Sequence, residues 1–134
     1  MKRLFALFLV LVLIGCKPAE VEEEEGLPAD LAAEIERIHN TPINDVDLSL
    51  VEDGSYEGKF GYQGVDYGVK VTVKDRRIES IEVTQTEDDE YAKMAEAVLD
   101  RVIEEQKITV DATTGATTTS LAFLKAVELA LTGR

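Results

Sequence analysis

A chain of 134 residues has room for one small domain once an N-terminal export segment and a linker are set aside. Its formal net charge of -13 argues against nucleic acid as a partner, because such a surface repels phosphate backbones. With one cysteine and one histidine, the sequence offers no internal disulfide, no CxxCH haem site, no cysteine-ligated iron–sulfur cluster and no His/Cys zinc site, so we expect no metal centre of these kinds.

Residues 1–15 are predicted to be a signal peptide. Lys2 and Arg3 give a positive start, and the apolar run over 4–14 is shorter than the roughly 20 residues that a membrane-spanning helix needs. The run ends in Leu13-Ile14-Gly15-Cys16, which resembles the bacterial lipobox. The resemblance implies cleavage before Cys16 and lipidation of that cysteine, so that acyl chains anchor the protein to a membrane. The alternative is an ordinary secretory leader or a single-pass anchor with an incidental cysteine.

Residues 16–27 are predicted to be an acidic tether that follows lipidated Cys16. The consecutive carboxylates of 22–25 repel one another and keep the chain extended. Lys17 stands where many Gram-negative lipoproteins of the inner membrane have Asp. We therefore expect a lipid-anchored protein of the cell envelope on the extracytoplasmic face, at the outer membrane or the outer face of the cell membrane. Loss of the leader leaves 12 basic against 27 acidic residues.

Residues 28–49 are predicted to form a helix and an extended lead-in. Leu31, Ile35 and Ile38 recur at helical spacing after Pro28, which indicates a helix over 28–39. His39 lies at the C-terminal end, where its charge favours the helix dipole, and we prefer this interpretation to a catalytic role.

Residues 50–134 are predicted to form the folded domain. Val69, Val71 and Val73 alternate with polar residues, as do Ile81 and Val83. This period of two predicts strands with one buried face, and their short connections predict an antiparallel meander. Aromatic residues and glycines interleave over 56–68, which core packing and a ligand-binding wall explain equally well.

The rest of the chain is predicted to be mostly helical. Apolar residues recur at helical spacing from Tyr91 to Val102, which predicts one helix ending near Gln106. A short β-prone segment follows at 108–110, and a last helix is predicted over 120–132. Strands followed by helices without regular alternation define an α+β fold, here an antiparallel meander packed with helices.

The segment before the last helix reads Asp111-Ala112-Thr113-Thr114-Gly115-Ala116-Thr117-Thr118-Thr119-Ser120. A loop that enters a helix presents unpaired N–H groups and the positive end of the helix dipole, which together favour a phosphate. Hydroxyls of Thr117, Thr119 and Ser120 are suited to capping the helix and to binding phosphate oxygens. A capped helix without a ligand is the alternative on this evidence alone.

This segment resembles the flavinylation motif of the FMN-binding domain family. The motif has an acidic residue, two positions, Ser/Thr-Gly-Ala-Thr, one position, and Ser/Thr-Ser, all of which are matched here. The resemblance implies FMN attached through a phosphoester to Thr117. It also implies a binding loop at the N-terminus of the last helix, made of Asp111, Thr114, Gly115, Ala116, Thr118, Thr119 and Ser120.

The family includes subunits of the sodium-pumping NADH:quinone reductase and of the Rnf-type complex, and small single-domain lipoproteins. A magnesium-dependent flavin transferase donates FMN from FAD, so this enzyme and a membrane redox partner are the expected partners. The resemblance implies an electron-transfer flavoprotein more than a stand-alone enzyme. Many members have a Pro-Gly loop after the third strand, whereas 84–89 contains neither residue. The alternative function is a lipoprotein without flavin that acts as a PepSY-like protein-binding module.

Overall fold

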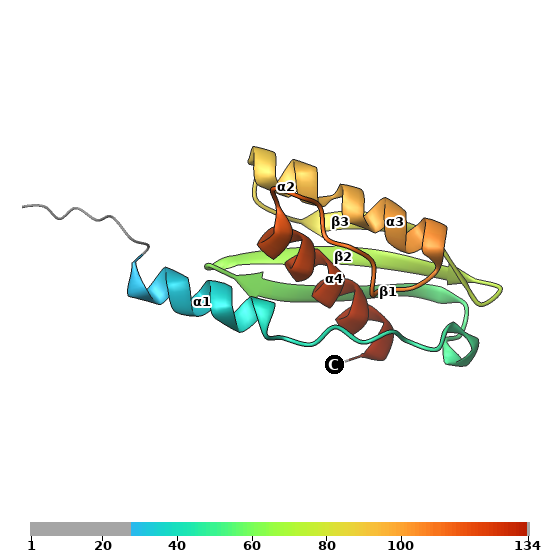
Figure 1. The fold of residues 1–134 in the computed structure, drawn as a ribbon. Helices are drawn as coiled ribbons and strands as arrows, with labels where there is room; N and C mark the ends of the chain where they lie inside the picture. Colours follow the sequence, from blue (N-terminus) through green and yellow to red (C-terminus); the bar gives the residue numbers. More distant parts are fainter. Residues whose placement is uncertain (1–27, 134) are drawn as a thin grey trace, which may run out of the picture.

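The computed structural model describes residues 28–133. The predicted signal peptide, Cys16 and the tether lie outside the described residues. Within them, the chain begins with helix α1 (Ala29–His39), followed by an extended lead-in that holds the short helix η4 (Leu48–Leu50). Three strands and three helices come next (Figure 1). No helix among residues 28–133 has the length and apolar character needed to cross a membrane.

The three strands form the predicted antiparallel meander. They are β1 (Gly54–Tyr62), β2 (Val65–Lys74) and β3 (Arg77–Gln85), and they pair in the order β1-β2-β3. Each connection is a two-residue turn whose residues have positive φ, at Gln63-Gly64 and at Asp75-Arg76. Turns of this kind match the natural twist of a hairpin, so these short connections set the register of the sheet.

One face of the sheet carries the core. Val69, Val71 and Val73 are fully buried beneath helix α4 (Thr117–Thr132), which crosses β1 and β2 (Figure 1). A Cβ atom at Gly58 would overlap the backbone of Ala126 and Ala130, so only glycine allows α4 to lie this close to β1. The α+β class and its meander are therefore confirmed.

The predicted single helix up to Gln106 is instead two helices. Helix α2 (Glu90–Ala95) packs against α4, whereas α3 (Ala97–Glu105) packs against both β3 and α4. The break falls at Glu96, whose carbonyl accepts a 2.9 Å hydrogen bond from the Leu99 N–H, a tighter i,i+3 pattern than that of an α-helix. Both helices pack on α4 but only α3 also packs on β3, and a periodic pattern along one segment does not reveal this difference.

Two further parts of the predicted secondary structure differ from the observed one, namely the segment 108–110 and the start of the last helix. Residues 108–110 form no strand, because the Asp45 carboxylate accepts hydrogen bonds from the N–H groups of Ile108 (2.7 Å) and Thr109 (2.9 Å) in place of a neighbouring strand. The last helix begins at Thr117, three residues before the predicted start at 120. The flavinylation motif therefore ends inside the first turn of α4.

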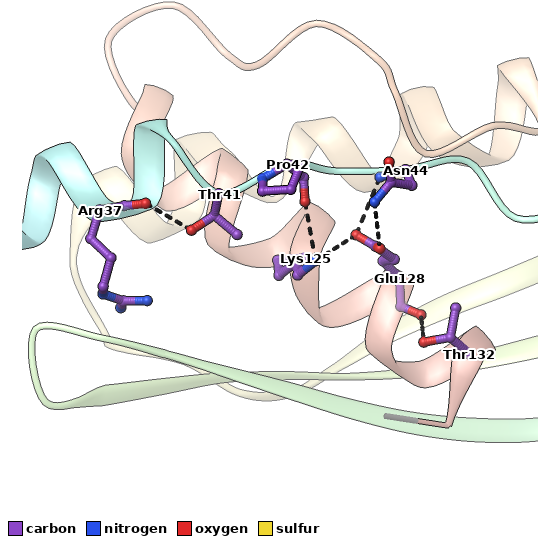
Figure 2. Close-up of polar contacts among 7 residues, drawn as sticks. All are labelled: Arg37, Thr41, Pro42, Asn44, Lys125, Glu128 and Thr132. Atoms are coloured by element: carbon purple, nitrogen blue, oxygen red, sulfur yellow. Dashed lines mark hydrogen bonds and ion pairs between the residues drawn. The ribbon is translucent and has the colours of Figure 1, made fainter.

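A polar cluster attaches the lead-in to α4 (Figure 2). The Glu128 carboxylate accepts hydrogen bonds from the backbone and side-chain amides of Asn44, both at 3.3 Å, and from Lys125 at 2.9 Å. Lys125 also donates to the carbonyl of Pro42 at 3.1 Å. Burial alone would raise the pKa of Glu128, but these hydrogen bonds outweigh it and hold that pKa below its ordinary value of 4.5.

Candidate functional site

The N-terminus of α4 is left without a side-chain cap. Ala116 occupies the N-cap position, and no side chain among the described residues accepts a hydrogen bond from the first N–H groups of the helix. The expected capping by threonine or serine hydroxyls is therefore wrong. The first N–H groups of a helix have no partner within the helix, so those of Thr117, Thr118 and Thr119 remain available to an anion.

Ser120 and Gly115 shape the loop that leads into this end. The hydroxyl of Ser120 is fully buried, donates to the Ala116 carbonyl at 2.7 Å and accepts from the Thr113 N–H at 3.1 Å. Gly115 has a φ of 89°, and a Cβ atom there would meet Met94 Cε at 3.1 Å. The glycine and the serine of the motif thus fix the backbone that presents Thr117.

Thr117 lies at a cavity of about 820 Å³ between α1, the β1–β2 turn, the loop after β3 and the start of α4. Ligand sites commonly have volumes of roughly 300–1,000 Å³. Its lining includes Leu31, Ile35, His39, Tyr62, Gln63, Tyr67, Glu87, Asp89, Tyr91 and Gly115–Thr119. By contrast, a depression of about 370 Å³ on the other face of the sheet contains no motif residue and no aromatic side chain.

Three tyrosines give the cavity aromatic walls. Tyr62 and Tyr67 are buried, with ring centroids 6.5 Å apart, and Tyr67 also packs edge-on against Phe123 at 5.3 Å. Tyr91, at the start of α2, keeps 54% of its surface exposed. Aromatic side chains beside free N–H groups suit a ligand that combines an aromatic ring with a phosphate.

The cavity is acidic. Glu87 and Asp89 line it, and none of the described residues in its lining is Lys or Arg. Burial, with a smaller effect of these two carboxylates, raises the pKa of Tyr67, and contact with the Thr119 hydroxyl offsets part of that rise. Asp89 also caps α2 by accepting a 2.7 Å hydrogen bond from the Ala92 N–H.

The predicted site residues divide into two groups. Those that line the cavity are Gly115, Ala116, Thr117, Thr118 and Thr119, whereas Asp111, Thr114 and Ser120 do not. Asp111 is exposed, and its carbonyl accepts a 2.6 Å hydrogen bond from Arg101. Asp111 and Thr114 therefore belong to the loop and Ser120 to the first turn of α4, and none of the three is part of the cavity wall.

Sequence reasoning missed several lining residues. His39, interpreted only as a helix-end residue, lies at the same cavity as the motif. The spacing of Leu31 and Ile35 predicts only a helix, and no sequence signal connects these residues to the motif more than 75 positions away. The interleaved aromatics of 56–68 did contain the relevant signal, since Tyr62 and Tyr67 line the cavity.

These features suit a domain that binds a phosphate-bearing aromatic ligand. The FMN-binding domain family matches residues 61–132, from the end of β1 through α4. The chain therefore belongs to the FMN-binding domain family. No curated protein matches the chain.

Proposed function

We propose that this protein is an electron carrier with FMN attached to Thr117 through a phosphoester bond. The observation that carries the proposal is the position of Thr117. It is exposed, it is the first residue of α4, and it lies at the cavity within a complete flavinylation motif. Bound FMN would supply the redox chemistry, and the protein would supply its position and its electrostatic surroundings.

The residues present fit both parts of FMN. The uncapped N–H groups of Thr117, Thr118 and Thr119 suit the phosphate, because the helix dipole adds a partial positive charge there. The rings of Tyr62 and Tyr67 suit the aromatic part of the flavin. The cavity is large enough to hold such a ring system.

The charge of the cavity favours covalent over reversible binding. A phosphate monoester carries a charge of about -1.5 to -2 at neutral pH. Glu87 and Asp89 would repel it, and no Lys or Arg among the described lining residues would attract it. A phosphoester to Thr117 would lower that charge and would hold the flavin whatever its affinity.

Attachment requires an activated hydroxyl, because a threonine is a weak nucleophile without a base or metal. His39 lies at the cavity, but no hydrogen bond joins it to Thr117 among the described residues. We propose that a magnesium-dependent flavin transferase supplies the activation. Thr117 Oγ1 would bond to the FMN phosphorus of FAD as the pyrophosphate bond breaks, with AMP leaving and the hydroxyl proton passing to a base of the transferase.

The N-terminal residues suggest where this carrier acts. The lipobox at Leu13–Cys16 and the acidic run after it support a protein tethered by lipid to the extracytoplasmic face of a membrane. There it would exchange electrons with a membrane redox partner.

Co-expression of the chain with a flavin transferase tests the attachment. The mature wild type is expected to gain about 438 Da, the mass of FMN less water, and Thr117→Ala is expected to gain nothing. Thr118→Ala is the matched control, since Thr118 is the next residue of the same cavity wall. No gain in the wild type would favour a flavin-free binding module, and a gain in Thr117→Ala would move the bond to another hydroxyl.

A further inference from the structure

Helix α1 contributes to the cavity although it lies outside the part of the chain that matches the family. The match begins at residue 61, whereas α1 spans Ala29–His39. Leu31 and Ile35 nevertheless line the same cavity as Thr117. Membership of the family does not account for this wall.

The apolar stripe of α1 extends beyond the protein core. Ile38 is 1% exposed and belongs to the core, and Ile35, one turn earlier, packs partly buried against it. Leu31, a further turn toward the N-terminus, is only partly buried, lies outside the core cluster and lines the cavity. An apolar stripe normally faces something apolar, so Leu31 presents an apolar surface that a ligand in the cavity could cover.

Polar contacts hold α1 in place against the hairpin and the lead-in. The Arg37 guanidinium bonds to Glu34 at 2.7 and 3.1 Å, donates to the Gly61 carbonyl at 3.1 Å and lies 5.3 Å from the ring centroid of Phe60. After the helix, Thr41 donates to the Arg37 carbonyl at 2.7 Å (Figure 2). A wall fixed in this way before a ligand binds costs little to organise.

We infer that α1 is the outer wall of the flavin site and that Leu31 and Ile35 contact the aromatic ring of the flavin. The inference rests on the proposed function and adds a role to it. The phosphoester at Thr117 retains the flavin, whereas α1 and the tyrosines fix the orientation of its ring. The attached ring is then held by the protein instead of rotating freely about its single covalent link.

Visible circular dichroism tests this inference, because a flavin gains strong optical activity only when its ring is held in a chiral environment. The full mature chain is co-expressed with a flavin transferase as wild type, Leu31→Ser, Leu31→Met and Ala33→Ser. Ala33 is the matched control, since it is exposed on α1 and does not line the cavity. Signals are compared per attached flavin, and far-ultraviolet spectra check that each variant is folded.

We expect Leu31→Ser to lose more than half of the flavin signal, and Leu31→Met and Ala33→Ser to keep that of the wild type. Equal signals in all four flavinylated proteins would overturn the inference and leave the proposed function intact. A wild type that gains no flavin mass would overturn the proposed function, and the inference with it.

Discussion

The two ends of α4 differ in whether their polar groups have hydrogen-bond partners within the protein. Toward the C-terminal end, Glu128 is buried, with 8% of the residue exposed, and its carboxylate accepts hydrogen bonds from Asn44 and Lys125. At the N-terminal end, the backbone has no side-chain cap and Thr117 is exposed beside a large cavity. Buried polar groups in proteins are nearly always paired. Burial explains the pairing at the C-terminal end, which helps to hold the domain together, whereas the free N–H groups at the unpaired N-terminal end are open to a ligand.

The largest expected effect on stability is at the paired end, where α4 lies against β1. Gly58→Ala places a Cβ atom into the backbone of Ala126 and Ala130, which cannot move aside as a side chain could. Overpacking of this kind should lower the free energy of unfolding by about 3 kcal/mol, measured by urea denaturation. Gly61→Ala is the control, because its nearest contact is the Asp66 side chain at 3.3 Å, and it should stay near the wild-type value. An equal loss in both variants would contradict the close helix–strand contact.

Breaking the polar cluster should have the next largest effect. Glu128→Gln removes the charge that Lys125 faces, and the two side chains are 10% and 17% exposed, so we expect a loss of about 2 kcal/mol at pH 7. Glu105→Gln, in an exposed pair with Lys107, should cost no more than about 0.5 kcal/mol.

The Glu128 effect should also depend on pH. Because the pKa of Glu128 is lowered in the folded protein, its contribution is fully present above the ordinary pKa of 4.5. The contribution is lost as the pH falls through the folded pKa, so the difference between wild type and Glu128→Gln should shrink below pH 4.5. Denaturation curves at several pH values measure this difference in stability. A difference that grows in acid would contradict a lowered pKa of Glu128.

One substitution at each end compares the two ends directly. Ser120 and Thr132 both donate to the carbonyl four residues earlier in the chain, at 2.7 and 2.8 Å. Ser120→Ala also removes the acceptor of the Thr113 N–H, so it should cost about 1 kcal/mol and slow flavinylation. Thr132→Ala, on an exposed residue, should cost less and leave flavinylation unchanged. Equal flavinylation rates in Ser120→Ala and Thr132→Ala would show that the hydrogen bonds of Ser120 are not needed to position Thr117 for flavinylation.

The smallest expected effect is on the potential of attached FMN. Glu87 lines the cavity and disfavours added negative charge on a reduced flavin, so Glu87→Gln should raise the midpoint potential by about 20 mV. Glu57→Gln, on an exposed residue outside this cavity, is the control. Spectroelectrochemical titration measures both, and a lower potential in Glu87→Gln would contradict the electrostatic argument.

Local patterns predicted much of the fold. The alternation around Val69–Val73 gave the meander, and Leu31, Ile35 and Ile38 gave a helix within one residue of α1. The break at Glu96 and the irregular segment at 108–110 were not predictable in this way. Both depend on partners distant in the chain, namely α4 and β3 for the helices and the Asp45 carboxylate for Ile108 and Thr109.

The candidate site shows the same division. The motif identified Thr117 and its neighbours, because consecutive residues carry that signal. The motif did not show that the Ser120 hydroxyl is already hydrogen-bonded to the backbone of Thr113 and Ala116. It also did not show that Leu31 and His39 lie at the cavity. Those facts depend on how α1 and the hairpin pack beside α4, and periodicity along the chain carries no information about that packing.

Peptide mapping of the protein co-expressed with a flavin transferase tests the central claim most directly. Trypsin cleaves after Lys107 and Lys125 and leaves 108–125 as one peptide that holds the whole motif. We predict a gain of about 438 Da on this peptide, placed on Thr117 by fragmentation. A peptide that carries no flavin, or a flavin on a different hydroxyl, would contradict the attachment of FMN to Thr117.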